Sequence, residues 1–408
     1  MRARPFYGWT IVAAAFSVLF IAYGAQYSFG IFFNALIDEF GWSRSSLAGA
    51  FSLYAFGYCV FGFPAGRLTD RWGPRVVITV GAVFLTAAFM GMALVTQLWQ
   101  PYVLYGLVAA LGMGTAYVPC NSTVVKWFAR RRGLAVGLAS SGGSVGTFVL
   151  PPLAQTLVAS VGWRSAYVVF GTAVFVILTS VAAIMRRDPE SMGLHPDGET
   201  AAVPRAASDA DGEWPLSRAV RTPTFWLLGA TFTATWVPVF IPLVHLVPFT
   251  RDLGYSPLVG AWSVSTLGAA AVAGRLVMGP LSDRIGRRPT LAVAMVLQAA
   301  AFAGFAVAQA LPALFMSAAA FGYSYGTIST LFPAIVSDFF GRAAAGALVG
   351  FLFMLAGSMA AWGPLGAGAI YDATGSYTTA FVLAAALNGV ALALLKATRP
   401  PALSLARA

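Results

Sequence analysis

Two ten-residue stretches of this sequence decide its fold. They are GRLTDRWGPR at residues 66–75 and GPLSDRIGRR at residues 279–288. The first Gly, the Asp, the Arg after it, the second Gly and the final Arg recur at a constant offset of 213 residues. The same offset relates further pairs, namely Gly41 and Gly254, Ser43 and Ser256, Gly133 and Gly346, Gly137 and Gly350, Pro151 and Pro364, and Gly162 and Gly375. Self-similarity at so long a period indicates two duplicated halves in parallel orientation.

The composition restricts the class of protein. Of the 408 residues, 59% are hydrophobic and only 10% are charged, whereas a soluble domain holds about 25% charged residues. The mean hydropathy is +0.77. These values exclude a soluble enzyme, a disordered regulator and a fibrous repeat. The net charge of +11 would suggest nucleic acid in a soluble protein. Here nearly all cations fall in short loops between apolar stretches, so we expect no nucleic-acid partner.

The sequence predicts an all-α integral membrane protein with twelve transmembrane helices in two pseudo-symmetric six-helix halves. A bilayer core needs about 20 apolar residues for each helix. The halves are 1–185 and 223–408, and 186–222 is a polar cytoplasmic linker that holds half of the 14 acidic residues. We interpret the linker as a tether, with regulatory binding as the alternative. The expected spans are 9–33, 46–67, 75–96, 100–127, 132–156, 164–185, 223–249, 257–281, 289–309, 312–338, 343–370 and 377–397.

The cations predict the orientation. With both termini in the cytoplasm, Arg44, Arg164 and Arg251 fall outside, Arg275 falls within a span, and the rest of the 25 Lys and Arg residues face the cytoplasm. The opposite orientation would invert the positive-inside bias. Short termini and compact loops suggest a prokaryotic source, and hence the cell (inner) membrane.

The two opening stretches resemble the signature loop of the major facilitator superfamily, which carries it after spans 2 and 8. The resemblance covers essentially the whole chain. It implies transport by alternating access, with a substrate site between the halves near the bilayer midplane. It also implies an ion cluster that latches the cytoplasmic side in the outward-open state, although the same charges could serve only to set topology. The latch residues would be Asp70, Arg71, Arg75, Asp283, Arg284 and Arg288.

Finer features resemble the monocarboxylate transporters and their bacterial oxalate/formate-exchanger relatives. They are FYGW at 6–9, WF at 127–128, RGLA at 132–135, DLG at 252–254 and GRL at 274–276. In these carriers an arginine at the position of Arg275 pairs with the substrate carboxylate. The resemblance therefore implies the same role here.

Arg275 also stands out on physical grounds. It lies eight residues before Asp283, about 12 Å along a helix, so it cannot reach an interface easily. A buried arginine costs roughly 2.5–3.5 kcal/mol on insertion scales and marks a functional site by default. All 14 acidic residues lie in loops or at span ends, so none can pair with it. A free guanidinium binds one carboxylate bidentately; the structural alternative is an arginine that snorkels or bonds a backbone carbonyl.

Charge counting narrows the substrate. The oxalate exchanger that the chain resembles has a second basic residue in span 11. This sequence has no Lys or Arg between Arg342 and Lys396. One fixed positive charge favours a small monocarboxylate such as lactate or pyruvate over a dicarboxylate.

Other site candidates are polar or aromatic residues within spans. Gln26 and Tyr27 resemble a site pair of the exchanger relatives. Tyr117 and Asn121 are one helical turn apart and share a helix face. Such side chains could shape a small pocket and hydrogen-bond a carboxylate, and helix packing is the alternative role for each. The remaining candidates are Tyr323, Tyr325 and Phe353.

Arg275 stays protonated at any relevant pH, so another group must carry a coupled proton. Animal-type monocarboxylate transporters place an aspartate four residues before this arginine, where the present chain has Ala271. His245 in span 7 is the titratable alternative. We therefore expect H⁺ symport through His245. The structural alternative is a histidine bonded to a backbone carbonyl freed by Pro248.

Other functions remain as alternatives. The closest is an oxalate/formate-type anion exchanger without proton coupling, and a drug exporter of the same superfamily is a further one. The sequence has no HExxH, GxxxxGK[ST] or intramembrane catalytic set, so we expect no enzyme activity, metal or cofactor. GGSVG at 142–146 predicts close helix packing. The expected partners are the small anion, H⁺ and the lipid bilayer, and the expected state is a monomer.

Overall fold

The structure is a computed structural model that describes residues 6–128, 131–198, 216–340 and 345–401. Every regular element in these ranges is helical, as the sequence predicts. We use "N half" for α1 to α8 and "C half" for α10 to α17. The N half contains α1 (Gly8–Tyr27), α2 (Phe29–Phe40), α3 (Arg44–Trp72), α4 (Pro74–Met92), α5 (Trp99–Pro101), the π-helix η1 (Tyr102–Ala109), α6 (Ala110–Gly114), α7 (Tyr117–Trp127) and α8 (Arg132–Ile184).

The segment between the halves forms only short pieces among its described residues. They are η2 (Glu190–Met192), η3 (Pro196–Gly198) and α9 (Leu216–Ala219). The part of the predicted linker at 199–215 lies outside the described residues. The C half contains α10 (Pro223–Trp236), α11 (Phe240–Asp252), α12 (Pro257–Ile285), α13 (Arg287–Val307), α14 (Leu311–Phe340), α15 (Ala345–Ala360), α16 (Trp362–Thr374) and α17 (Thr378–Ala397).

The helices account for the predicted twelve spans. Within the described residues, ten stretches are long and apolar enough to cross a membrane. One of them, Leu134–Ile184, has 51 residues and is broken at Gly162, where φ is 80°, so it supplies two spans. α14 has 30 residues and adds another, although Ser, Thr and Tyr residues reduce its hydropathy. The predicted fold class is therefore confirmed.

Several span boundaries differ from the predicted ones because helices continue past the apolar stretch. The first span was expected to end at residue 33, but α2 continues to Phe40 and stops at Gly41, whose φ is 66°. A break at Ser28, whose hydroxyl donates to the Gly24 carbonyl, separates α1 from α2. Similar breaks separate α6 from α7, α10 from α11 and α15 from α16. Neighbouring helices satisfy the backbone groups that such breaks expose.

The 213-residue repeat reappears in the backbone. α3 and α12 both have 29 residues and begin after Ser43 and Ser256. They end at Gly73 and Gly286, whose φ values are 82° and 94°. Residues other than glycine rarely adopt a positive φ. The pairs Gly41 and Gly254, and Gly162 and Gly375, also have positive φ in both members.

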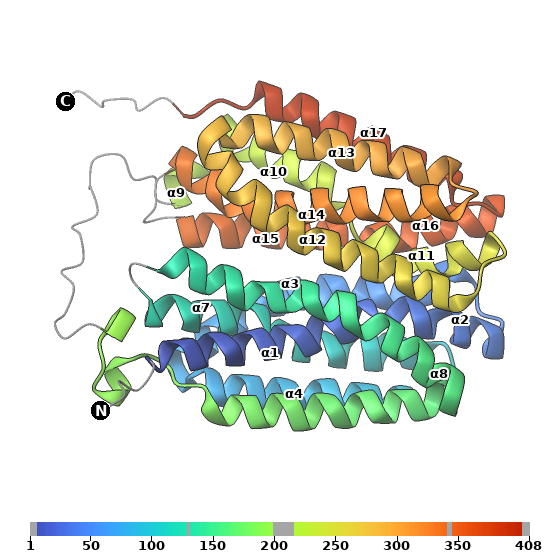
Figure 1. Cartoon of the computed structure of the whole chain (residues 1–408), viewed down its shortest axis with the longest axis horizontal. Coiled ribbons are helices and arrows are strands. Elements are labelled where there is room, and N and C mark those ends of the chain that lie inside the picture. Colours follow the sequence, from blue (N-terminus) through green and yellow to red (C-terminus); the bar gives the residue numbers. More distant parts are fainter. Residues whose placement is uncertain (1–5, 129–130, 199–215, 341–344, 402–408) are drawn as a thin grey trace.

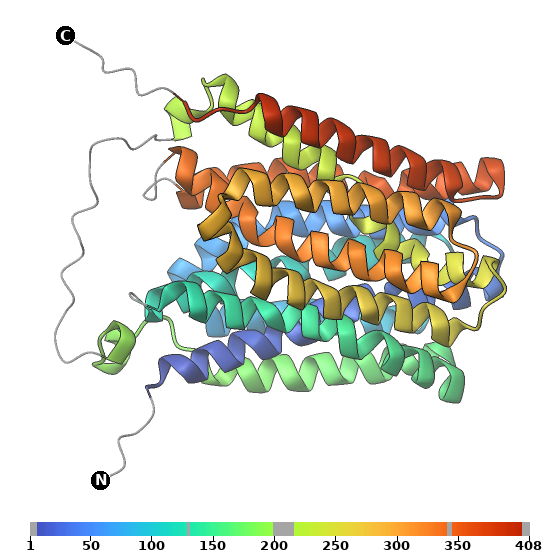
Figure 2. The same cartoon turned by 45° about the horizontal axis from the view of Figure 1, so that its top comes forward.

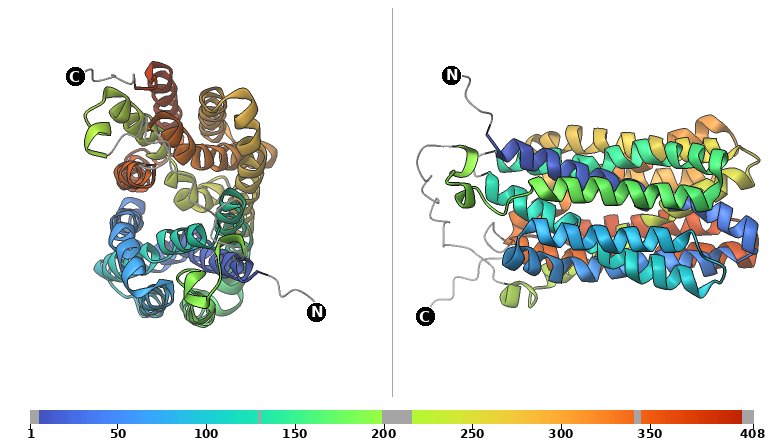
Figure 3. Two further views of the ribbon diagram at one scale, coloured as in Figure 1. Left: turned by 90° about the vertical axis from the view of Figure 1, so that its left-hand side faces the viewer. Right: turned by 90° about the horizontal axis from the view of Figure 1, so that it is seen from below.

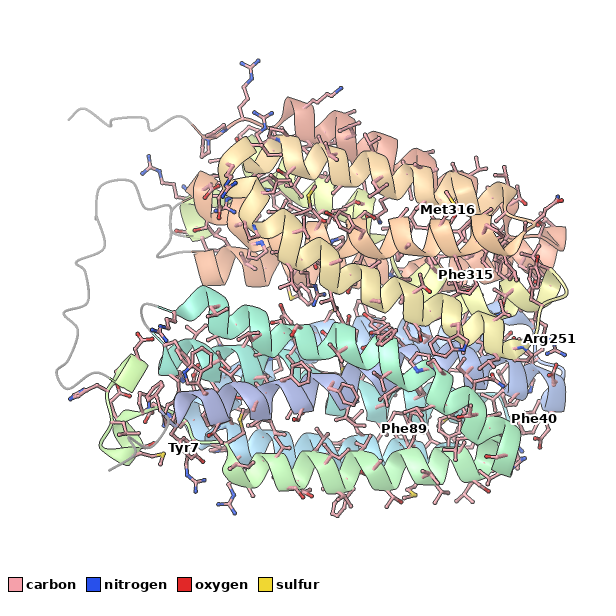
Figure 4. The ribbon with its side chains drawn as sticks, viewed as in Figure 1. Tyr7, Phe40, Phe89, Arg251, Phe315 and Met316 are labelled. Atoms are coloured by element: carbon pink, nitrogen blue, oxygen red, sulfur yellow. The ribbon has the colours of Figure 1, made fainter. Side chains whose placement is uncertain are left out.

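The two halves lie side by side with their helices roughly parallel to one long axis (Figure 1). The end-on view in Figure 3 shows them as two groups of helices, and the turned view in Figure 2 shows the helices of both halves running along the long axis. α1 begins and α17 ends at the same end of the molecule, which we call the terminal face. The other end, which we call the opposite face, carries Phe40 and Arg251 (Figure 4).

Glycines allow the closest helix crossings. A Cβ atom on Gly142 or Gly146 of α8 would overlap the carbonyls of Phe16 and Phe20 in α1. The packing predicted for the GGSVG stretch is thus confirmed at both ends. Gly322 and Gly326 of α14 meet the backbone of α12 at Leu267 and Ala271 in the same way. Small residues let backbones approach where lipid offers no hydrophobic driving force for helix association.

Candidate functional site

Arg275 lies in α12 at the junction of the two halves. Its neighbour Gly274 packs directly on the Tyr323 carbonyl of α14, which fixes this part of α12. The half-buried Arg275 extends to the N half, where Nη1 donates to the Ser140 carbonyl of α8 over 3.2 Å. Its Nε is buried and has no hydrogen-bond partner among the described residues. The guanidinium therefore links the two halves, and its Nε–H is a buried donor without an acceptor among the described residues.

No carboxylate among the described residues forms an ion pair with Arg275. The printed sequence already places every acid in loops or at span ends, and the acids in described ion pairs bond other cations. An isolated charge in a low-dielectric interior is costly unless a counter-ion is supplied. The site is therefore suited to an anion that enters from outside the protein.

Two of the predicted residues connect to Arg275 through Ser140. The Ser140 hydroxyl donates to Oδ1 of Asn121 over 3.0 Å. The Nδ2 of Asn121 donates to the Tyr117 carbonyl over 3.0 Å, as their one-turn spacing predicts. The carbonyl that Arg275 contacts is thus held by a chain of hydrogen bonds from α8 to α7.

Aromatic side chains from both halves meet beside this chain. The Tyr117 ring stacks on Phe353 of α15, with centroids 6.1 Å apart and planes at 8°. Tyr23 of α1 contacts Tyr117 edge-on at 6.4 Å, and Trp236 of α10 contacts Phe353 edge-on at 5.5 Å. Tyr117 is still 40% exposed although it lies in the middle of a long apolar stretch. Its aromatic neighbours therefore leave part of the ring accessible.

Tyr27 and Tyr325 make a second junction between the halves. Their hydroxyl oxygens lie 3.5 Å apart, and either one could donate. Tyr27 also packs against Tyr23 at 5.8 Å, so it belongs to the same aromatic group as Tyr117. Tyr325 stacks on Phe321 of its own helix at 6.3 Å.

Two predicted residues take other positions. Gln26 is 1% exposed and enclosed in the N half, where Tyr105 donates to its backbone carbonyl over 3.3 Å. Both polar atoms of the Gln26 side chain are buried without a hydrogen-bond partner in the described part of the chain. Tyr323 meets the site through its backbone carbonyl, which lies against Gly274 and accepts from Thr327.

His245 is buried in α11 and bonds two groups of the C half. Its Nδ1 lies 2.9 Å from the Tyr377 hydroxyl, and its Nε2 lies 2.9 Å from the Pro364 carbonyl of α16. The structural alternative predicted a hydrogen bond from His245 to the backbone carbonyl that Pro248 leaves free. That acceptor was wrong, because the ring bonds the Pro364 carbonyl instead. The bond to Pro364 directs the side chain toward α16, and Phe33 of α2 covers the ring edge-on at 5.5 Å.

The opposite face is held closed by ion pairs between the halves. Arg44 at the start of α3 bonds both carboxylate oxygens of Asp252 at 2.6 Å. Arg251 bonds both oxygens of Asp38 at 2.6 Å. In addition, Asp372 accepts from the backbone N–H groups of Arg44 and Ser45 at 3.1 and 2.9 Å. These contacts form what we call the outer gate, comprising Asp38, Arg44, Arg251, Asp252 and Asp372.

The predicted latch residues lie at the terminal face, where the described pairs stay within one half. Asp70 bonds Lys126 at 2.6 Å, and Arg287 bonds Asp283 at 3.1 Å and Asp338 at 2.6 Å. Arg288 donates to the carbonyls of Leu395 and Lys396. The other latch candidates, Arg71, Arg75 and Arg284, are exposed at helix ends.

Sequence reasoning missed several residues of this arrangement. Tyr23 could have been found, because it precedes Tyr27 by one helical turn and so shares its face. Ser140, Trp236 and the outer gate depend on which helix faces meet between the halves. One indication of the gate is present in the sequence: Arg44 and Arg251 are two of the three arginines expected on the outside.

The chain is similar in sequence to several known proteins. The sequence profile of the Major Facilitator Superfamily matches residues 15–249 and again 231–407. Monocarboxylate transporter 11 of Homo sapiens is 30% identical over 392 residues, covering 93% of this chain and 80% of that protein. The oxalate:formate antiporter of Oxalobacter formigenes is 27% identical over 389 residues, covering 95% and 90%.

Solved structures share the fold. A bacterial homologue of the human lysosomal transporter Spinster, in an inward-facing and occupied conformation, aligns with a TM-score of 0.74 at 17% identity over 97% of each chain. The nucleoside transporter NupG aligns with a TM-score of 0.74 at 12% identity, covering 95% of this chain and 99% of that one. Together these matches show a multi-pass membrane transporter rather than an enzyme, and the chain belongs to the Major Facilitator Superfamily, in its branch of monocarboxylate transporters and oxalate:formate antiporters.

Proposed function

We propose that this chain is a secondary active transporter of small monocarboxylates such as lactate or pyruvate, and that it works by H⁺-coupled symport. Arg275 binds the carboxylate, and the two halves alternate access to it. The relatives support this choice because their names specify monocarboxylate, oxalate and formate as substrates.

The observation that carries the proposal is the position of Arg275 and its hydrogen bonding. Its guanidinium lies between the halves, contacts Ser140 and retains a buried Nε without a partner in the described residues. A carboxylate that bonds Nε and one terminal nitrogen would satisfy that donor and neutralise the charge. Because this is one charge, a single carboxylate is the best match.

The aromatic group beside Arg275 suits the rest of a small acid. Tyr117 is partly exposed, and Phe353 and Tyr23 flank its ring. Rigid aromatic faces bound a small apolar volume, and the Tyr117 hydroxyl can bond a 2-oxo or 2-hydroxy group. Asn121 would help to hold this wall in place through the Tyr117 carbonyl.

The outer gate supports alternating access. If the cation-rich terminal face lies in the cytoplasm, the Arg44–Asp252 and Arg251–Asp38 pairs close the outside of an inward-facing state. The return step would break these pairs and join the halves at the terminal face, where Asp70 and Asp283 would exchange partners. His245 bonds the Tyr377 hydroxyl, which accepts from the gate residue Arg44. This position is suitable for a group that takes up protons from outside.

An anion exchanger without proton coupling is the second candidate. It is favoured by the 27% identity to the oxalate:formate antiporter over 95% of this chain. Exchange also needs no titratable group, since Arg275 remains charged throughout the cycle.

The test is uptake of labelled L-lactate into liposomes that contain the purified protein. Accumulation in empty vesicles, driven by an inward proton gradient, is expected for symport. Uptake only into vesicles preloaded with unlabelled acid would replace symport with exchange. Absence of uptake in both would overturn the choice of monocarboxylates.

Arg275→Gln should abolish uptake, since a lost charged hydrogen bond in the site costs about 2–5 kcal/mol, or at least 30-fold. Arg187→Gln is the matched control, because Arg187 is exposed and pairs only with the adjacent Asp188 among the described ion pairs. Arg187→Gln should transport at the wild-type rate.

A further inference from the structure

The Arg44–Asp252 pair of the outer gate coincides with a break in the internal repeat. Glu39 and Arg164 of the N half correspond, at the 213-residue offset, to Asp252 and Tyr377 of the C half. In the N half, Arg164 Nη1 bonds the two Glu39 oxygens at 2.6 and 2.8 Å. The C half has tyrosine in place of that arginine. Asp252 therefore has no equivalent partner in its own half, and it bonds Arg44 across the gate.

Arg44 connects this ion pair to His245. Its Nη1 donates to the Tyr377 hydroxyl at 2.9 Å, and its guanidinium lies 3.8 Å above the Tyr371 ring. The Tyr377 hydroxyl in turn lies 2.9 Å from His245 Nδ1. One hydroxyl group thus separates the arginine from the imidazole.

The hydrogen-bond directions in this chain assign the protons. The Pro364 carbonyl can only accept, so His245 Nε2 carries a hydrogen. The Tyr377 oxygen accepts from Arg44, and its own hydrogen is then directed at Nδ1. This arrangement favours a neutral imidazole while the gate is closed. A doubly protonated ring would turn a second N–H toward a hydroxyl that already accepts from a cation.

The other charges around His245 are engaged in the same gate. Asp252, on the same helix, is held by Arg44, and Asp372 of α16 is held by two backbone N–H groups of α3. From α2, the uncharged Phe33 ring covers the histidine. Opening the gate would remove Arg44 from this group and leave both carboxylates behind, which favours a positive imidazole.

A cavity of about 240 Å³ opens beside this group. Its lining includes Asp252, Gln309, Tyr371 and Tyr377. The volume and the polar lining suit several water molecules. Water from the opposite face can therefore reach the Asp252 and Tyr377 side of the chain even with the gate closed.

We propose that Arg44 is a positioning residue for proton coupling, acting on His245 through Tyr377. With the gate closed, Arg44 directs the Tyr377 hydroxyl and keeps His245 neutral. With the gate open, Arg44 leaves with the N half, and His245 Nδ1 takes a proton from water on that side. When the gate closes, Arg44 returns beside Tyr377 and disfavours the charged ring. The ring then releases this proton to the substrate site, which now opens to the terminal face. This inference rests on the proposed H⁺-coupled function.

The chain allows a direct test, because it has only 2 histidines, His195 and His245. In a His195→Gln background, ¹⁵N-histidine NMR of the intact detergent-solubilised protein reports His245 alone. The parent should show a neutral ring protonated at Nε2. With Arg44→Gln, the doubly protonated signal should appear at a pH about one unit higher. Arg44→Lys keeps the positive charge, so it should stay near the parent.

Arg251→Gln is the matched control, because it breaks the other ion pair of the gate without touching Tyr377. The doubly protonated His245 signal could move to the same pH in Arg44→Gln and Arg251→Gln. That result would overturn the proposal, since gate opening alone would then explain it. No displacement in Arg44→Gln would overturn it as well. Size-exclusion profiles of all variants check folding.

The pH profile of lactate uptake separates this inference from the proposed function. If wild-type uptake ignores the proton gradient, the proposed symport fails, and the proposed coupling role of Arg44 fails with it. If wild-type uptake is proton-driven and Arg44→Gln keeps the same pH profile, only the Arg44 inference fails. The expected result is an Arg44→Gln profile displaced to higher pH, with Arg251→Gln displaced less.

Discussion

Arg275 joins three features at one residue: it lies inside a span, it has no carboxylate partner among the described residues, and it contacts the other half through Ser140. A fixed charge so placed needs an anion for part of each transport cycle. The carboxylate of the substrate is the anion that we propose.

The geometry of the guanidinium should matter as well as its charge. Arg275→Lys keeps the charge but replaces a planar fork with a single ammonium group. We expect a KM for lactate about 10-fold higher, which corresponds to the loss of one charged hydrogen bond. Initial uptake rates measured against lactate concentration give this value. Wild-type KM in Arg275→Lys would show that the fork is not used.

The stack of Phe353 on Tyr117 predicts a smaller change in the KM for lactate. Phe353→Leu removes the ring that stacks on Tyr117. Aromatic pairs contribute about 0.5–1.5 kcal/mol beyond their buried area, so KM should rise about 2- to 12-fold. Phe315→Leu, on α14, is the control, because no described aromatic pair includes Phe315 and its KM should not change. An equal rise in both variants would argue against a specific role for the stack.

Sequence alone singled out Arg275 as a candidate, because an interior charge is visible without knowledge of packing. It also singled out Tyr117 and Asn121 as candidates, because their one-turn spacing fixes a shared face. It could not identify Ser140 or Trp236. Their roles depend on contacts between helices more than 100 residues apart, such as the Arg275–Ser140 bond.

Among the elements, α1 and α8 of the N half cross closely at Gly142 and Gly146. The sequence predicted close helix packing at this glycine-rich stretch, but not that α1 is the partner. It did not predict the extent of α2 or the break at Ser28. Those depend on a hydroxyl–carbonyl bond and on a positive-φ glycine beyond the apolar stretch.

The crossing predicts a difference between two glycines. Gly146→Leu would force the backbones of α1 and α8 apart and should cost about 1–3 kcal/mol. Gly389 of α17 has open space around the position of a Cβ, so Gly389→Leu should be tolerated. Thermal unfolding in detergent measures both. An unchanged melting temperature in Gly146→Leu would show that this contact can yield without loss.

Considered as a whole, the molecule is two related helical halves that are bonded to each other at the opposite face. The sequence predicted the duplication from the 213-residue offset, and the positive-φ glycines repeat at the same offset. It did not predict which end would be closed. A transporter of this kind has more than one stable arrangement, and one sequence encodes them all.

The Arg251–Asp38 pair should bias this equilibrium. Arg251→Asp places two carboxylates together and should favour opening of the opposite face, by about 1 kcal/mol or less because both partners are about half exposed. Asp38→Arg combined with Arg251→Asp restores the attraction and should restore the bias. Distances between spin labels on the two halves measure this. A double variant that remains as open as Arg251→Asp would contradict a role for the pair.

The measurement that tests the central claim most directly is equilibrium binding of L-lactate to the purified protein, by calorimetry, in wild type and Arg275→Gln. Binding avoids the other steps of the transport cycle, and propane-1,2-diol serves as the uncharged analogue. We expect heat of binding for lactate in the wild type, none for the diol, and none for lactate in Arg275→Gln. Equal lactate affinity in the two proteins would contradict the assignment of Arg275 as the carboxylate-binding residue.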